Sequence, residues 1–406
     1  MEQTMNDSRM DLDSFEGYRR PDGRVGVRNH VAVVPVSVTA SAVATQLAAE
    51  AGPQVRATPH QMPLDPVAYA REQTERVLRG IGSHPNVGAT LLVALGTETI
   101  AIDELADDIA GTGTPVETLS IRDARGTAAA LRDGGDAVAS LQEEARTARR
   151  ESAGVEELVV ALECGGSDAT SGLAANPAVG SFCDRLVEAG GTGILSETPE
   201  FIGAEHILAE RCVDEAVRES LLSYVERREQ MAQLMGVDFR GAQPSPGNQE
   251  GGLTTLEEKS LGAIAKGGTK PLRAVLEYAE RLPVGGGFVV MDSPGYDVES
   301  VSGKVAGGAQ VVVFTTGRGS TTGNPIAPVV KVTGNSDTFD RISENMDLDA
   351  SGILSGQPID AVSDAIYDLV RSVASGEPTT SERHGMEEFA ISDIPPNVAA
   401  ELGGRR

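Results

Sequence analysis

Short runs of apolar, β-branched residues alternate with longer amphipathic stretches over most of the chain. In the first third, residues 30–38 and 88–96 have the pattern of buried strands, whereas 40–52, 67–82 and 123–150 have the apolar spacing of helices. Strands that alternate with helices are typical of βαβ units, in which the strands pair in parallel. This part of the chain therefore predicts a parallel sheet covered by helices.

A second alternation begins after a polar stretch at 141–154 and continues toward the C-terminus. Strands are predicted at 155–163, 192–197, 286–292, 309–316 and 327–334. Helices are predicted at 176–190, 203–235, 256–265, 271–281 and 358–375. The stretch 239–252 is rich in Gly and Pro, which is typical of a loop.

The length of the chain favours more than one domain. Its 406 residues exceed the roughly 250–300 residues that one hydrophobic core supports. We predict an α/β fold with two α/β domains, both with mainly parallel, Rossmann-like sheets. The first domain is expected at 17–150 and the C-terminal catalytic domain at 151–395, after an acidic, polar tail at 1–16 that we expect to be disordered.

Glycine-rich turns that carry polar side chains follow three of the predicted strands. They are CGGSD at 164–168, VMDSPGYD at 290–297 and TTGRGSTTG at 315–323. Open parallel sheets bind their ligands at the carboxyl ends of the strands. We therefore expect the three turns to contribute to one shared site.

The charge of the chain is strongly negative and its basic residues are unusual. There are 60 acidic and 34 basic residues, which gives a formal net charge of −26. The lysines are Lys259, Lys266, Lys270, Lys304 and Lys331, and every other basic residue is Arg. A surface rich in carboxylates is tolerable where salt screens their repulsion, so we expect a salt-adapted protein. An acidic protein in which codon usage replaces Lys by Arg is the alternative.

Composition also excludes several classes of function. So acidic a chain lacks the clustered Lys and Arg that nucleic acid or an anionic membrane surface attracts. No apolar run approaches the roughly 18 residues of a membrane helix, and the N-terminus has no secretory signal pattern. The three cysteines, Cys164, Cys183 and Cys212, form no CxxC pair, which fits a reducing cytoplasm.

Six blocks that combine glycine with charged residues at the predicted turns carry a resemblance to a known family. They are GYRRPDGRVGVRNH (17–30), ECGGSDATSGLAANPAVG (163–180), ILSETPEFIGAEHIL (194–208), SPGNQEGGLTTLEEKSLGAIAKGGTK (245–270), MDSPGYDVESVSGKVAGGAQVVVFTTGRGS (291–320) and ENMDLDASG (344–352). In this order they resemble the catalytic region of the altronate/galactarate dehydratase family. The chain looks like a large catalytic subunit, related also to the large subunit of sulfolactate sulfo-lyases.

The resemblance implies a lyase that depends on a divalent metal, Fe²⁺, Mn²⁺ or Mg²⁺. Members of the family remove water from an aldonate or aldarate, such as altronate or galactarate, and form a 2-keto-3-deoxy acid. Such a reaction needs a base for the proton beside the carboxylate, charge stabilisation for the enediolate and an acid for the leaving hydroxyl.

The candidate site residues lie within or next to these blocks. As catalytic residues we expect Arg28, Asn29, His60, Cys164, Ser167, Asp168, Lys266 and Arg318. As substrate-binding residues we expect Ser171, Asn176, Thr316, Gly317 and Gly319, and as metal ligands Glu197, Glu200 and His206. Arginine suits bidentate binding of a carboxylate, and two carboxylates with an imidazole within ten residues suit a metal or an acid–base pair.

Each of these residue types also has a structural interpretation, which the sequence leaves open. Glu197 and Glu200 could serve as acids at a helix N-terminus, and Lys266 could stabilise a helix C-terminus. A lysine retained where lysine is so rare nevertheless favours a role for its ammonium group. Cys164 is as compatible with packing as with a ligand role.

The chain also departs from the family pattern. Thr39, Thr97 and Asn324 stand where family members have cysteine, as does a position near Ala350, so a metal or cluster site has been changed or lost. Only 16 residues precede the first block, where single-chain members have a small β-rich domain. The resemblance therefore implies a separate small β-rich subunit, and it also implies a homo-oligomer.

Two other functions stay open at this point. One is a sulfo-lyase or a hydrolase that acts on another 2-hydroxy or diketo acid, which a panel of substrates would separate from a dehydratase. The other is a non-catalytic binding subunit that kept the fold. It would bind an acid but no metal, and Asp168 and Glu197 would lie far apart.

Overall fold

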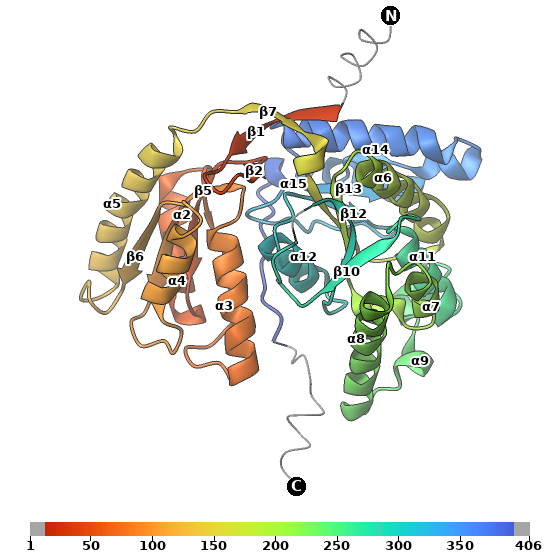
Figure 1. Cartoon of the computed structure of the whole chain (residues 1–406), viewed down its shortest axis with the longest axis horizontal. Coiled ribbons are helices and arrows are strands. Elements are labelled where there is room, and N and C mark those ends of the chain that lie inside the picture. Colours follow the sequence, from red (N-terminus) through yellow and green to blue (C-terminus); the bar gives the residue numbers. More distant parts are fainter. Residues whose placement is uncertain (1–12, 284, 394–406) are drawn as a thin grey trace, which may run out of the picture.

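The computed structural model describes residues 13–283 and 285–393. Two parallel sheets, each covered by helices, lie side by side, and a small antiparallel sheet lies between them at the top of Figure 1. This arrangement confirms the predicted α/β fold with mainly parallel sheets. Residues 1–12 of the predicted tail fall outside the described residues, and Ser14–Arg19 form strand β1.

The smaller parallel sheet is built by the first third of the chain. Its strands, in spatial order, are β4 (Val55–Ala57), β3 (His30–Pro35), β5 (Val87–Ala94) and β6 (Val116–Ser120). The covering helices are α2 (Val38–Ala51) and α5 (Thr127–Ala145) on one face, and α3 (Ala68–Gly82) and α4 (Ile102–Ala110) on the other. Strand β3 is buried along its whole length, as expected for an inner strand covered on both faces.

The larger sheet has seven parallel strands. In spatial order they are β10 (Leu272–Leu276), β11 (Gly287–Met291), β9 (Thr192–Leu195), β8 (Val159–Cys164), β12 (Val311–Thr315), β13 (Val329–Thr333) and β14 (Leu348–Asp349). The chain proceeds outward from β8 in one direction to β9 and in the other to β12 and β13. The order therefore reverses next to β8, and such a reversal opens a crevice at the carboxyl ends of the strands.

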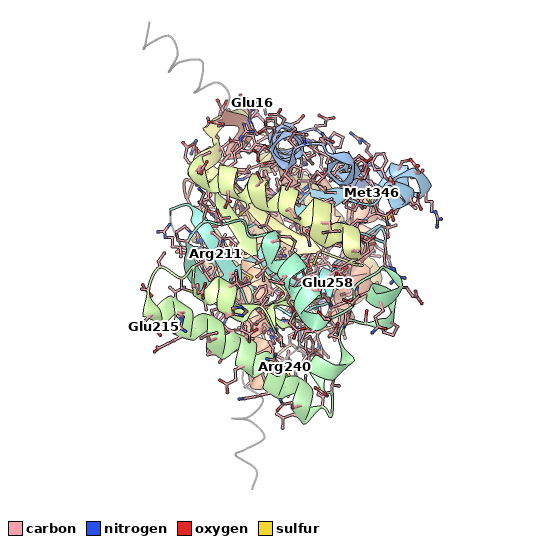
Figure 2. The ribbon with its side chains drawn as sticks, turned by 90° about the vertical axis from the view of Figure 1, so that its right-hand side faces the viewer. Glu16, Arg211, Glu215, Arg240, Glu258 and Met346 are labelled. Carbon is pink, nitrogen blue, oxygen red and sulfur yellow. The ribbon has the colours of Figure 1, made fainter. Side chains whose placement is uncertain are left out.

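Helices cover both faces of the larger sheet. The helices of this layer are α6 (Asn176–Glu188), α7 (Glu205–Ala209), α8 (Glu215–Leu234), α9 (Phe239–Ala242), α10 (Pro246–Glu250), α11 (Leu256–Ala265), α12 (Asp297–Ala306), α13 (Ser336–Arg341), α14 (Ile359–Ala374) and α15 (Thr380–Arg383). In Figure 2, Glu215 marks the start of α8 and Glu258 marks α11 on the face that the view shows. No helix among the described residues is long and apolar enough to cross a lipid bilayer.

The antiparallel sheet joins the two layers. Its strands are β2 (Val25–Gly26), β1 (Ser14–Arg19) and β7 (Glu151–Gly154). The polar stretch at 141–154 was predicted to be the boundary between the two domains. It ends in strand β7, which pairs with strand β1 near the start of the chain. Burial of Phe15 and Ala153 within the core of the larger layer anchors this sheet.

The two parallel layers share a hydrophobic core where α3 packs against α12. One cluster of buried residues includes Val34 and Leu78 from the smaller layer and Met291 and Val312 from the larger. A Cβ atom at Gly80 of α3 would lie 2.2 Å from the backbone oxygen of Ala306, so only glycine permits this approach.

Three predicted elements differ in the structure. The prediction of a helix at 271–281 is wrong, because residues 272–276 form strand β10. This strand pairs in parallel with β11 and buries the side chains of Leu272 and Leu276. The helix predicted at 203–235 is divided into α7 and α8, because Asp214 caps a new helix by accepting a hydrogen bond from the Val217 N–H at 2.9 Å. The loop predicted at 239–252 contains the short helices α9 and α10.

Candidate active site

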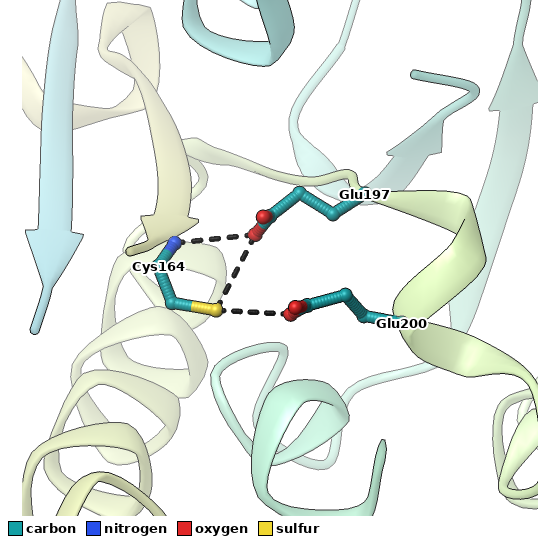
Figure 3. A group of neighbouring side chains, drawn as sticks. All are labelled: Cys164, Glu197 and Glu200. Atoms are coloured by element: carbon teal, nitrogen blue, oxygen red, sulfur yellow. Dashed lines mark hydrogen bonds between the residues drawn. The ribbon is translucent and has the colours of Figure 1, made fainter. Parts of the chain in front are cut away.

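The carboxyl ends of β8 and β9 place three potential ligand atoms together. Cys164 is the last residue of β8, and Glu197 and Glu200 follow β9 on one short 3₁₀ turn, Thr198–Phe201. The Cys164 Sγ atom lies 3.1 Å from Glu200 Oε2 and 3.4 Å from Glu197 Oε2 (Figure 3). These three atoms all lie within 4.8 Å of one another.

The backbone at Glu197 is held in an unusual conformation. Its φ of 67° and ψ of 57° fall in the left-handed region, which is uncommon for any residue other than glycine. The Glu197 N–H donates to Ser293 Oγ at 2.9 Å, and the Cys164 N–H donates to Glu197 Oε2 at 3.2 Å. Strain of this kind persists where the surroundings over-determine a functional position.

Two lysines from α11 and its C-terminal end contact the carboxylates of this group. Lys266 Nζ lies 3.2 Å from Glu197 Oε2, and both side chains are only 1% exposed. Lys259 Nζ lies 3.1 Å from Glu200 Oε1. The two ammonium groups therefore balance the two carboxylates in a region that solvent hardly reaches.

The surroundings shift the pKa values of Glu197 and Glu200 in opposite directions. Burial, together with Glu163 and Glu200, raises the pKa of Glu197 well above its usual value. Burial also acts on Glu200, but Lys259 and Lys266 bring its pKa below the usual value. Neighbouring carboxyls whose pKa values move apart are suited to opposite roles in proton transfer.

The same carboxylates also shift the pKa values of the Cys164 thiol and the Lys266 ammonium group. Burial and the charges of Glu197 and Glu200 raise the pKa of the Cys164 thiol well above its usual value. Burial disfavours the charge on Lys266, yet Cys164, Glu197 and Glu200 together raise its pKa. Lys266 is accordingly a cation in this site.

A second ion pair lies directly behind the group. Glu163 and Lys304 are fully buried, and Lys304 Nζ donates to Glu163 Oε2 and to the Leu162 backbone oxygen. The Ser300 hydroxyl also donates to Glu163 Oε2, at 2.7 Å. A charge buried this deeply is tolerated only with such partners, so this pair fixes α12 against β8.

A cavity of about 430 Å³ opens beside Lys259. Its lining includes Ser167, Asp168, Ser171 and Asn176, and Lys259 reaches it from α11. The volume falls within the range of small-molecule sites. Four predicted site residues thus surround one cavity next to the buried group.

Within this cavity, Asp168 is held by its neighbours. Its carboxylate accepts hydrogen bonds from the Ser171 N–H at 2.9 Å, the Thr170 hydroxyl at 2.7 Å and the Asn335 amide at 2.9 Å. Asn176 is engaged as well, because its amide donates to the Gly262 oxygen and accepts from the Thr315 hydroxyl. Both residues therefore also organise the turns that form the cavity.

The turn after β12 meets the turn after β8. A Cβ atom at Gly317 would lie 2.1 Å from Asp168 Oδ1, so glycine is required for the two turns to touch. The Arg318 N–H donates to the Gly166 oxygen at 3.0 Å, and the Thr316 hydroxyl accepts from the Gly319 N–H at 2.9 Å. The Arg318 side chain is half exposed at the rim, where its guanidinium lies 4.0 Å from the Glu250 carboxylate.

Four predicted site residues lie outside this arrangement. The Arg28 guanidinium forms two hydrogen bonds with Glu382, at 2.7 and 2.8 Å. Asn29 bonds to Arg20 and to the Ala145 oxygen, and buried His60 bonds to the Pro35 oxygen at 2.8 Å. His206 is exposed on α7 and does not belong to the group of potential metal ligands found among the described residues.

Three charged residues near the group are absent from the predicted set. Glu163 and Lys304 form the buried pair, and Asp297 begins α12 close to the end of β8. The signal for Asp297 was its position in the VMDSPGYD turn after β11. Nothing in the sequence pairs Glu163 with Lys304, because 141 residues separate them.

A divalent ion fits the donor chemistry of Cys164, Glu197 and Glu200. One thiolate and two carboxylates suit Fe²⁺ or Mn²⁺ better than Mg²⁺, which prefers oxygen ligands alone. The high pKa of the thiol is no obstacle, because coordination to a metal deprotonates a thiol outright. The neighbouring lysines would have to shift to admit the ion, since they contact the same carboxylates.

Models of two protein families match the chain. The D-galactarate/altronate dehydratase C-terminal region matches residues 155–396, and the second domain of D-galactarate dehydratase/altronate hydrolase matches residues 17–146. The first match contains every residue of the buried group, and the second contains the smaller parallel sheet.

Several curated proteins are similar over most of the chain. The (2R)-sulfolactate sulfo-lyase subunit beta of Chromohalobacter salexigens is 37% identical over 384 residues, which cover 94% of this chain and 97% of that protein. The altronate dehydratase of Escherichia coli is 33% identical over 92% of this chain and 76% of its own length. The galactarate dehydratase (L-threo-forming) of Escherichia coli is 35% identical over 79% of this chain and 63% of its own length.

Proposed function

The chain belongs to the D-galactarate/altronate dehydratase family of lyases, and we propose that it eliminates water from a sugar acid. The substrate class is an aldonate or aldarate, such as altronate or galactarate, and the product is a 2-keto-3-deoxy acid. The observation that carries the proposal is the buried group of Cys164, Glu197 and Glu200 with its two lysines. It offers proton-holding groups and fixed positive charge at the carboxyl ends of the strands.

We assign the steps of the reaction to individual residues of this group. Removal of the proton beside the substrate carboxylate creates negative charge, which the ammonium groups of Lys259 and Lys266 stabilise. As the C2–H electron pair forms the C2=C3 double bond, the C3–O bond breaks and the hydroxyl leaves with a proton as water. Glu197, whose pKa is raised by its burial, is suited to supply that proton.

We propose that Cys164, Glu197 and Glu200 hold a divalent ion, Fe²⁺, Mn²⁺ or Mg²⁺, with Fe²⁺ or Mn²⁺ favoured by the thiolate. When bound, the ion would act as a Lewis acid toward the substrate carboxylate. Ser167, Asp168 and Arg318, at the cavity and its rim, are proposed to orient the carboxylates and hydroxyls of the substrate. Ser171, Asn176, Thr316, Gly317 and Gly319 would shape the same surface.

The quaternary structure is proposed from one relative. The sulfo-lyase of Chromohalobacter salexigens is named as subunit beta, and nearly its whole length matches this chain. This supports an enzyme of more than one kind of subunit, and we propose a separate small β-rich subunit as partner and a homo-oligomer of the assembled enzyme. The division into domains at 17–150 and 151–395 is supported by the two family matches, and we propose a salt-adapted, cytoplasmic enzyme.

A second candidate function is sulfo-lyase activity toward (2R)-sulfolactate. It is favoured by the same relative, which is 37% identical and similar in length. The chemistry is closely related, because a proton beside a carboxylate is removed and the neighbouring group leaves as sulfite rather than water. The buried group serves either reaction.

The test uses protein purified anaerobically in high salt, alone and with its small β-rich partner. Metal content is measured first. Altronate, galactarate and (2R)-sulfolactate are then supplied with Fe²⁺, Mn²⁺ or Mg²⁺, and 2-keto-3-deoxy acid and sulfite are assayed separately. We expect a bound divalent ion and a keto acid from a sugar acid.

The outcomes separate the candidates. Release of sulfite without turnover of any sugar acid would favour the sulfo-lyase. Binding of an acid without metal or turnover would favour a non-catalytic subunit. Cys164→Ser should lose metal, whereas the matched control Cys183→Ser, in buried α6 away from the group, should keep it.

A further inference from the structure

We propose that Asp297 is the base that takes the proton from the substrate carbon next to the carboxylate. The inference rests on the proposed function and assigns a step for which the buried group alone offers no free carboxylate. It is carried by the way α12 faces β8.

One face of α12 is aligned with the end of β8. Ser300 and Lys304 both donate hydrogen bonds to Glu163, and Asp297 lies three residues before Ser300 on the same helical face. Because Glu163 immediately precedes Cys164, this register carries Asp297 just past the last residue of the strand. The helix therefore places a carboxylate at the strand end where open sheets bind ligands.

The residue after Cys164 makes room for this carboxylate. A Cβ atom at Gly165 would lie 2.2 Å from Asp297 Oδ2 and 2.6 Å from the ring of Phe314. Any side chain at this position would have to displace Asp297. The absent side chain thus lets the carboxylate lie directly over the backbone next to the potential metal ligands.

Asp297 differs from Glu163, Glu197 and Glu200 because no lysine or arginine of the described residues forms an ion pair with it. Glu163, Glu197 and Glu200 are each paired with a lysine, whereas no ion pair to Asp297 exists within the described part of the chain. The Asp297 residue is only half-buried. A base must be free to receive a proton, and Asp297 alone meets this condition among these four.

The surroundings tune the same carboxyl for proton transfer near neutrality. Burial, together with Glu163 and Glu200, raises the pKa of Asp297 to about 7, although Lys266 acts in the opposite direction. The position at the start of a helix would by itself lower the pKa. An acid–base group is most effective when its pKa lies near the working pH.

The step balances without a further reactant. The Asp297 carboxylate takes the C2 proton, the C2–H electron pair forms the C2=C3 bond, and the C3–O bond breaks. The leaving hydroxyl takes a proton from a neighbouring acid and departs as water. The enol then becomes the keto acid, with one proton added at C3 and one lost from the enol oxygen, and Asp297 returns its proton to solvent.

The experiment compares Asp297→Asn with the matched control Glu299→Gln, which removes an acidic charge from the same helix end. In the metal-loaded enzyme, we expect Asp297→Asn to lower kcat by about 10²–10⁴-fold with little change in KM. Its remaining activity should no longer depend on an ionisation near pH 7. Glu299→Gln should keep both the rate and the pH profile of the unmodified enzyme.

A second variant distinguishes a role of Asp297 in catalysis from a role in folding. Asp297→Ala should recover part of its activity when formate or acetate is added, because a free carboxylate can then occupy the emptied position. A role in structure alone would give no such recovery. Unchanged kcat in Asp297→Asn, or loss without recovery in a folded Asp297→Ala, would overturn the inference, whereas an unmodified enzyme that turns over no acid would instead overturn the proposed function.

Discussion

The lysines of this chain are concentrated in its interior. Lys266, Lys304 and Lys331 are fully buried, and the Lys259 side chain is 13% exposed. Of the five lysines, Lys270 is the most exposed, with a side chain that is 26% exposed. The rarity of lysine in the sequence was therefore informative, because Lys259, Lys266 and Lys304 were retained where a compact, largely buried cation pairs with a carboxylate.

Removing one member of the buried pair behind the site should destabilise the fold. Lys304→Met would leave the Glu163 carboxylate buried without its cation, which typically costs about 3–5 kcal/mol. Urea unfolding followed by circular dichroism would measure the change. Lys270→Met, which removes an exposed ion pair with Glu188, is the matched control and should cost much less, because water screens that pair. Equal losses in the two variants would contradict the role assigned to burial.

At the level of single site residues, spacing along the chain predicted proximity only in part. Glu197 and Glu200 were correctly expected to lie together, because they share one turn after β9. His206 was expected with them, but it lies exposed one helix later. Arg28 carries the guanidinium expected to bind substrate, yet its partner Glu382 lies 354 residues away, and no local pattern reveals such a contact.

At the scale of elements, segments with a clear apolar pattern were predictable, whereas a short segment with an ambiguous pattern was not. The helices near 67–82 and 358–375 were predictable because their apolar positions follow one period over many residues, and the strands near 88–96 and 309–316 because each is a continuous apolar run. Strand β10 was predicted as a helix, since Leu272 and Leu276 are spaced four apart and fit both periods.

The antiparallel sheet could not be predicted from local sequence patterns, because its strands pair over a long distance along the chain. Strands β1 and β7 pair Ser14 with Gly154, so each is stabilised by a segment more than a hundred residues away. Neither stretch is strongly apolar, and the sequence gives no sign of the partner. The predicted meeting of glycine-rich turns succeeded for the opposite reason, because parallel strands bring their carboxyl ends to one edge wherever they lie in the chain.

At the scale of the whole molecule, three buried histidines make stability depend on pH. Burial lowers the pKa of His30 to about 3, His60 to about 4 and His84 to about 3. The unfolded chain binds these protons near pH 6.5, so it holds more protons than the fold between pH 6.5 and 4. Stability should therefore fall as the pH drops through this window, by about 2 kcal/mol for each histidine at pH 5.

Urea unfolding at pH 7 and at pH 5 measures this loss. Asp297 acts in the opposite sense, because its raised pKa favours the fold as the pH falls from 7 toward 4. His60→Gln, which can still bond to the Pro35 oxygen, should reduce the loss between the two pH values. A variant with the same pH dependence as the unmodified protein would show that His60 is not a source of it.

The net charge of −26 should make the stability of the fold depend on salt. Repulsion among surface carboxylates is screened as the Debye length falls from about 10 Å at 0.1 M to about 3 Å at 1 M. We expect the unfolding midpoint in urea to rise with NaCl over this range. Asp107, Asp133 and Asp136 are exposed and form no ion pair with any described residue, so converting all three to Asn should stabilise the protein at low salt and weaken its salt dependence. Exposed ion pairs such as Arg240–Glu229 act against this trend, because salt weakens them. A midpoint that is unaffected by NaCl in both proteins would contradict salt adaptation through charge.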